Sequence, residues 1–177
     1  MNTIRLGGQA ISSTNYATKR SFNFNPEFVR AAAENFLAAG VTEIEIPQGV
    51  LDPDGKNPDT GVDREKIAAT VAGLPKETCV IATYLGGGTL GADNEAFLAS
   101  ATKTVELLCA HFPDMRFAML HPAGPANGTP DKIPGIVAAW AKLAEFAAKK
   151  RPGFQVGLHN HYDSSCETAE QVRAYLG

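Results

Sequence analysis

The feature that most constrains the fold is a regular alternation of short apolar runs with longer amphipathic runs. Predicted strands begin near residues 4, 43, 78, 116 and 155, so successive strands start 35 to 39 residues apart. After each strand, apolar residues recur with the period of a helix. Serial strand–helix units of this length predict an α/β fold with a parallel sheet, either doubly wound or closed as a (β/α)₈ barrel.

The length of the chain limits how much of a barrel it can build. Eight units at this spacing need roughly 300 residues, and barrels typically need about 250, whereas this chain has 177 residues. We therefore expect one domain over residues 1–177. It is either a five-stranded doubly wound sheet or a TIM-type (β/α) barrel with about five of its eight units, truncated at the C-terminus. Open strand edges in such a partial barrel favour association into a homo-oligomer.

Composition and charge narrow the classes of partner. The net charge is -3 and the pI is near 5.8, which gives no basic excess for nucleic acid or for an anionic membrane. No apolar run approaches the ~20 residues of a membrane-spanning helix, and the N-terminus has no signal-peptide pattern. Three scattered cysteines without CxxC spacing are typical of reduced thiols. These features predict a cytoplasmic protein that binds neither nucleic acid nor membrane.

Polar or flexible residues end or follow every predicted strand. The carboxyl ends of parallel strands meet at one edge of the sheet, so both candidate folds place active-site groups there. Glu45 ends a strictly alternating strand, residues 42–46, and its carboxylate would point into the interior if both sheet faces are covered. The full set consists of Gln9, Glu45, the glycines at 86–88, His121, His159 and His161.

A glycine-rich segment follows the third predicted strand. Residues 86–91 match G-x-G-x-x-G between a strand and a helix, which is the position of a dinucleotide-binding loop. That motif also requires an acid at the end of the next strand, where this sequence has Leu120-His121-Pro122. We therefore favour a substrate loop, in which the backbone amides of Gly87 and Gly88 cradle a phosphate, over nicotinamide binding.

The segment 155–163 carries the densest group of ligating and proton-carrying side chains. Alternate side chains of a strand share a face, so His159 and His161 are expected to point the same way. Two imidazoles with the Asp163 carboxylate beyond them are typical of a metal or acid–base site, and the simpler alternative is two hydrogen-bonded structural histidines. A nucleophilic role for nearby Cys166 would need a lowered thiol pKa, which spacing does not reveal.

Helix ends and helix faces give further expectations. Asn25-Pro26-Glu27 opens a helix that Gly40 ends. Residues 168–171 form a capping box, and we expect Val172 and Leu176 on the buried side of the helix that follows. Trp140 lies at helical spacing among apolar residues, which predicts a core position rather than stacking on a cofactor.

The fifth predicted unit resembles a known superfamily. Gly157-Leu158-His159-Asn160-His161, followed by Glu167-Thr168-Ala169-Glu170-Gln171-Val172, is similar to xylose-isomerase-like TIM barrels, most of all to sugar phosphate isomerases/epimerases and inosose dehydratases. Supporting features are the glycine pair before Gln9 and the segment Ala39-Gly40-Val41-Thr42-Glu43-Ile44-Glu45. The resemblance extends over all five units.

This resemblance implies an isomerase or epimerase that moves a proton next to a carbonyl of a sugar, sugar phosphate or polyol. Members typically hold a divalent metal (Mn, Mg, Co or Zn) with two glutamates, an aspartate and a histidine from late strands. Strands six to eight lie beyond this chain, so it does not supply that set. With the strand-end pattern, the resemblance assigns His159 and His161 as metal ligands, Glu45, His121 and Asp163 as catalytic, and Gln9, Gly87, Gly88, Asn160 and His161 as substrate contacts.

Other functions stay open on these residues. An inosose-type dehydratase acting on a cyclic polyol would use nearly the same groups, and its product would have lost water. A non-catalytic sugar-binding or assembly module would bind without turnover. A repair endonuclease of the same superfamily is disfavoured because the net charge is acidic and no basic patch is visible.

Overall fold

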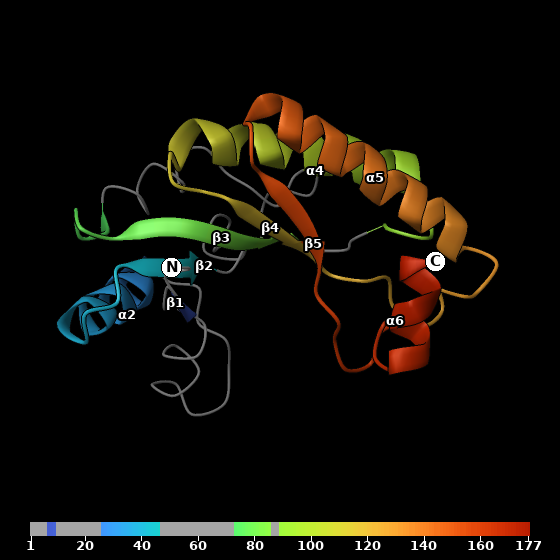
Figure 1. Cartoon of the computed structure of the whole chain (residues 1–177), viewed down its shortest axis with the longest axis horizontal. Helices are drawn as coiled ribbons and strands as arrows, with labels where there is room; N and C mark the ends of the chain where they lie inside the picture. The colour runs from blue at the N-terminus through green and yellow to red at the C-terminus, as the bar shows by residue number, and fades with distance from the viewer. Residues whose placement is uncertain (1–6, 10–25, 47–72, 86–88) are drawn as a thin grey trace, which may run out of the picture. The chain divides into compact units, whose positions relative to one another are not determined.

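The computed structural model describes residues 7–9, 26–46, 73–85 and 89–177 (Figure 1). The chain divides into two compact units, Met1–Thr83 with Leu107–Met115 and Tyr84–Glu106 with Arg116–Gly177. Among the described residues, a helix follows β1, β3, β4 and β5, and residues 47–72 after β2 lie outside the described part of the chain. The elements are β1 Gly7–Gln9, α2 Pro26–Ala38, β2 Glu43–Ile46, β3 Cys79–Leu85, α4 Asn94–His111, β4 Phe117–Leu120, α5 Ile133–Lys150, β5 Gln155–Leu158 and α6 Ala169–Leu176.

The strands form a sheet in the order β1-β2-β3-β4-β5, and the described pairings of β1 with β2, β2 with β3 and β4 with β5 are parallel. Backbone pairing places Gln9 beside Glu45 and Glu45 beside Ala82. Parallel strands that follow one another in sequence order, with helices between them, are the arrangement predicted from the strand spacing. The α/β fold of serial strand–helix units is therefore confirmed.

In the first unit, β2 shows the predicted alternation. Ile44 and Ile46 are fully buried, whereas Glu45 between them is half-buried. The helix α2 begins at Pro26, as predicted, and the chain turns at Gly40, whose φ of +78° lies in the left-handed region that favours glycine after a helix. The buried face of α2 includes Val29, Ala32 and Ala33.

In the second unit, α5 packs on β5 (Figure 1). The Trp140 indole N–H donates to the Val156 carbonyl over 2.9 Å. The amides of Gln155 and His159 point toward β4, so the Val156 carbonyl between them points to the opposite edge of the strand. Trp140 therefore satisfies a strand-edge acceptor, and its side chain is half-buried rather than in the core position predicted for it. The buried residues of α5 are Ile133, Ile136, Ala139, Leu143 and Ala147.

The short helix α6 has the predicted capping box but a different buried face. The Thr168 side chain accepts from the Gln171 amide, and the Gln171 side chain accepts from the Thr168 amide. The prediction for Leu176 was wrong, because this side chain is 70% exposed while Tyr175 is only 3% exposed. Tyr175 is buried because its hydroxyl finds a hydrogen-bond partner there. Among the described residues, no helix is long and apolar enough to cross a membrane.

Candidate functional site

Three histidines lie just beyond the carboxyl ends of neighbouring strands in the second unit. The His121 amide donates to the Leu85 carbonyl at the end of β3, and the His159 amide donates to the Leu120 carbonyl at the end of β4, each over 3.1 Å. Backbone hydrogen bonding thus continues one residue past β4 and one past β5. His121 and His159 are half-buried, and His161, in the loop after β5, is exposed.

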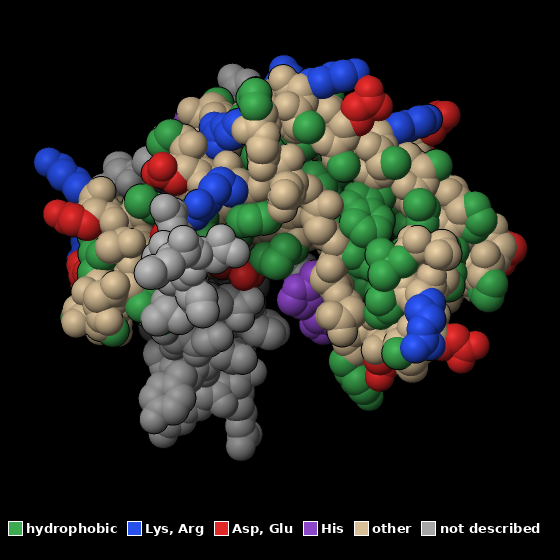
Figure 2. All heavy atoms as spheres, viewed as in Figure 1, with side chains coloured by type: hydrophobic (Ala, Val, Ile, Leu, Met, Phe, Trp, Pro, Cys, Tyr) green, Lys and Arg blue, Asp and Glu red, His purple; other side chains and the backbone are tan. Residues whose placement is uncertain are grey.

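The structure brings the side chains of these three residues together. The ring centroids of His121 and His161 are 4.8 Å apart, and those of His159 and His161 are 6.0 Å apart. In the space-filling view, histidine side chains form one purple group at the surface (Figure 2). Because β5 ends at Leu158, His161 owes its place to the following loop, and strand alternation is not the cause of the grouping.

Backbone carbonyls set the tautomers of two of the rings. The His121 Nδ1 lies 2.9 Å from the Pro122 carbonyl oxygen, and the His161 Nδ1 lies 2.8 Å from the Tyr162 carbonyl oxygen. A carbonyl only accepts, so each Nδ1 carries the proton and donates it. In the neutral form the lone pair then lies on Nε2, which is the nitrogen that accepts a proton or ligates a metal.

The loop that carries His161 is wound into a compact turn. The Ser164 hydroxyl donates to the His161 carbonyl over 2.6 Å, and the His161 amide donates to the Cys166 carbonyl over 3.3 Å. Asp163 has a φ of +55°, in the left-handed region, and its amide donates to a Glu167 carboxylate oxygen over 3.1 Å. This turn is stabilised from within, by its own side chains.

The remaining predicted site residues are distributed as follows. Asp163 and Asn160 belong to the loop after β5, where both are exposed. Gln9 and Glu45 are neighbours at the carboxyl ends of β1 and β2, in the first unit. Gly87 and Gly88 lie outside the described residues, so the substrate loop assigned to them stays a prediction.

The residues present fit a metal ion only as a pair of nitrogen ligands. Two imidazoles on one tetrahedral ion should have ring centres roughly 5 Å apart, close to the 4.8 Å between His121 and His161. Within the described part of the chain, no three His, Cys, Asp or Glu side chains converge in a way that could hold an ion. These residues therefore do not assemble the set of four metal ligands that is typical of the enzymes this sequence resembles.

Cys166 does not have the character of a nucleophile. Its side chain is fully buried, and that burial raises the pKa of the thiol above its usual value. A catalytic thiol needs the opposite shift, because the thiolate is the reactive form. The alternative that made Cys166 a nucleophile is thus disfavoured.

Two buried hydroxyls near the histidines were missed from the sequence. Ser165 and Tyr175 are each 3% exposed, and their oxygens are 2.6 Å apart. Tyr175 falls three residues after Val172, so a helical stripe through both positions was available as a signal. For Ser165 the local sequence holds no such signal, because its partners are distant in the chain.

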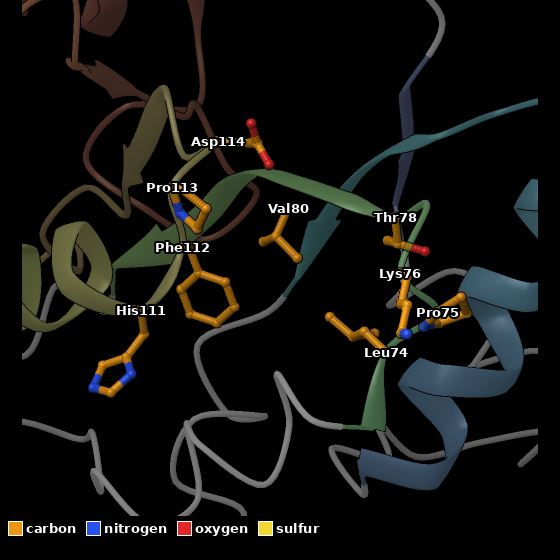
Figure 3. A pocket seen from close by; sticks show the side chains of 9 residues that line it. All are labelled: Leu74, Pro75, Lys76, Thr78, Val80, His111, Phe112, Pro113 and Asp114. Carbon is orange, nitrogen blue, oxygen red and sulfur yellow. The ribbon is translucent and has the colours of Figure 1, made fainter.

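A pocket of about 400 Å³ lies in the first unit, and its lining contains none of the predicted site residues. Figure 3 shows Leu74, Val80 and Phe112 pointing into it from three segments. The Thr78 hydroxyl beside it is buried without a hydrogen-bond partner. The lining also includes Pro75, Lys76, His111, Pro113 and Asp114.

Comparison with known proteins gives a likeness of fold. No protein-family model matches the chain, and no curated protein matches it. Among solved structures, it is similar to a sugar phosphate isomerase/epimerase from Parabacteroides distasonis, with a TM-score of 0.53 and 18% sequence identity. The match covers 97% of this chain. The likeness shows an α/β fold of the TIM-barrel type.

The match also fixes how much of that fold is present. This chain spans 60% of the length of the P. distasonis protein. The five strand–helix units thus correspond to a part of a TIM barrel, as the strand spacing and the resemblance predicted. At 18% identity the likeness concerns the fold alone.

Proposed function

We propose that this chain carries part of the active site of a sugar or sugar phosphate isomerase, in which His121 and His161 transfer a proton at the carbon next to a carbonyl. The observation that supports this most is the pair of imidazoles whose ring centroids are 4.8 Å apart. Each imidazole donates its Nδ1 proton to a backbone carbonyl in a hydrogen bond. Both residues lie at the carboxyl end of the parallel sheet, where barrels of this type place their chemistry.

The spacing of the two rings favours one-sided proton transfer. A sugar placed between two rings would need about 3.5 Å of contact distance on each side, which is more than the 4.8 Å that separates their centroids. Both imidazoles therefore approach a substrate from the same side. The Nε2 of one imidazole takes a proton from the carbon next to the carbonyl. An imidazole on the same side of the substrate returns the proton to the neighbouring carbon, as aldose–ketose isomerisation requires. Inversion at one carbon by bases on opposite faces would need a second group elsewhere.

The other predicted residues complete the proposal. Asp163 and Asn160 are exposed in the same loop, where Asp163 remains proposed as a catalytic residue and Asn160 as a substrate contact. Glu45 and Gln9 are neighbours at the carboxyl ends of β2 and β1 in the first unit and remain proposed as catalytic and substrate-binding residues, respectively.

A divalent metal held by Nε2 of His121 and of His161, in place of the metal pair first predicted, His159 and His161, is an alternative to proton transfer by these two rings, because an Nε2 lone pair that ligates a metal accepts no proton. When bound, such an ion polarises the substrate carbonyl as a Lewis acid. In this arrangement the half-buried His159 is not a metal ligand, and its ring lies beside that of His161 in the group of three histidines.

Solvent-exchange measurements test the proposal. The chain is incubated in D₂O with a panel of aldoses, ketoses and their phosphates, with and without Mn²⁺, and deuterium next to the carbonyl is followed by NMR. We expect incorporation by wild type and a loss of about 10²- to 10⁴-fold in H121Q and H161Q. The matched control is H111Q, which changes the one histidine in the first unit. Incorporation that survives in both H121Q and H161Q would contradict the proposal.

The products separate the alternatives. Loss of water from a cyclic polyol would identify a dehydratase that uses the same groups, whereas saturable sugar binding without exchange would identify a non-catalytic module. A thermal melt with and without Mn²⁺, with Mg²⁺ for comparison, tests the metal. Saturation at about 100 times Kd stabilises a protein by about 2.7 kcal/mol, which raises the Tm of a chain of this size by roughly 5–10 °C. H121Q and H161Q should each abolish that rise.

A further inference from the structure

The loops after β4 and β5 are joined by one buried serine. The Ser165 amide donates to the Ala123 carbonyl over 3.0 Å, and the Ser165 hydroxyl donates to the same oxygen over 2.8 Å. Ala123 lies two residues after His121, and Ser165 lies four residues after His161. One residue thus connects the segments that carry the two imidazoles, through its backbone amide and its side chain.

Tyr175 holds that serine from α6. Because the Ser165 hydroxyl gives its only proton to the Ala123 carbonyl, the Tyr175 hydroxyl must be the donor in the 2.6 Å contact between the two oxygens. This direction needs a protonated phenol. Burial raises the pKa of Tyr175 above its usual value, although the Ser165 hydrogen bond partly opposes that rise. The phenol is therefore neutral and able to donate at physiological pH.

The connection from Ser165 back to His161 is short. The Ser164 hydroxyl donates to the His161 carbonyl, and the Ser164 hydroxyl oxygen accepts from the Cys166 amide over 3.1 Å. The His161 amide in turn donates to the Cys166 carbonyl. Because these bonds close the turn on both sides of Ser165, a displacement of Ser165 is transmitted to the backbone of His161.

We propose that Ser165 and Tyr175 are positioning residues, which hold His161 against His121 by tying the loop after β5 to the loop after β4. We call them the hydroxyl pair. Both side chains are buried, and they hydrogen-bond to each other and, through Ser165, to the Ala123 carbonyl. The catalytic consequence rests on the proposed function, whereas the geometric role does not.

The geometric role is tested by NMR with labelled histidines. In wild type, H121A should shift the ring resonances of His161, because a neighbouring aromatic ring 4.8 Å away is lost. In S165A and in Y175F, the same H121A change should leave His161 nearly unshifted. The matched control is T104V, which removes another buried hydroxyl, one whose hydrogen bond to the Ser100 carbonyl stays within α4. T104V should keep the full response.

A full response of His161 in both S165A and Y175F would overturn the proposal. Circular dichroism identifies the folded variants, and if S165A does not fold, the isosteric Y175F decides alone. In the exchange assay, kcat of both variants should fall about tenfold to hundredfold with KM nearly unchanged, because the bases are misplaced while sugar contacts remain. If wild type exchanges no deuterium with any sugar, the proposed function fails, and the NMR response still decides the positioning role.

Discussion

Gly128 provides the sharpest test of how tightly the loops around the histidines are packed. A Cβ added at this residue would lie 2.0 Å from the Ser165 Oγ and 2.1 Å from the Ser165 Cβ. Ordinary van der Waals contact begins at 3.4 Å. Ser165 is a short side chain already bonded to Ala123 and Tyr175, so it cannot swing aside. The G128A substitution must therefore push the two loops apart.

The magnitude follows from two contributions. Overpacking a filled interior costs about 1–3 kcal/mol, and a displacement of more than an ångström belongs at the upper end. Breaking one of the Ser165 hydrogen bonds adds about 1 kcal/mol. We expect G128A to lower the free energy of unfolding by about 3–4 kcal/mol, which for a chain of this size is a Tm lower by about 10 °C.

Gly124 offers a matched control in the same loop. A Cβ there meets nothing within 4 Å, and the residue is not among the glycines with positive φ. G124A should be neutral or should stabilise by up to about 1 kcal/mol, because alanine restricts the unfolded chain. Thermal melts followed by circular dichroism compare the two variants directly.

A double variant identifies the obstacle. In an S165G background the atoms that collide with the new Cβ are gone, so adding G128A should cost clearly less than it does in wild type. If G128A and G124A have the same Tm, the close approach of the two loops does not exist in solution and the reasoning fails. If S165G gives no relief, an obstacle other than Ser165 causes the loss.

Three further substitutions or conditions have expected outcomes. T168A removes the side-chain cap of α6 and should lower the free energy of unfolding by about 1 kcal/mol in urea titrations; no loss would mean that the cap contributes nothing. W140F leaves the Val156 carbonyl without its indole donor and should lower the free energy of unfolding by about 1–3 kcal/mol, measured in melts followed by circular dichroism. No loss would mean that water replaces the donor. Burial raises the pKa of Cys166 and of Tyr175, so the unfolded state loses these protons first as pH rises. The free energy of unfolding should therefore fall as pH rises above about 9, and C166A should make the part of that fall nearest about pH 9 less steep. If the free energy of unfolding of C166A falls with pH as steeply as that of wild type, the contribution of Cys166 is contradicted.

Local patterns predicted the elements of this fold well. The helix at Pro26 and the capping box at Thr168 follow from residues within one turn of each helix end. Burial of Ile44 and Ile46 follows from alternation along a single strand. The strand spacing and the length left a doubly wound sheet and a partial barrel open, and the family resemblance favoured the partial barrel. The structural likeness confirms that fold.

The grouping of the histidines could be predicted only in part. That His121 and His159 both follow strand ends is visible in the sequence, and parallel strands bring such positions to one edge. The pairing of His121 with His161, rather than His159 with His161 alone, depends on how the loop after β5 turns back. Strand alternation does not extend into that loop, so it gave no guide there.

The sequence by itself determined the strands, the helices, their order and the edge of the sheet at which chemistry gathers, because these depend on residues close together in the chain. Only the tertiary structure decided that Tyr175, and not Leu176, is buried, and that Ser165 joins two loops. The partners of Ser165 lie 42 residues before it and 10 residues after it. No periodicity records a hydrogen bond across such distances, because its energy exists only once the chain has brought the partners together.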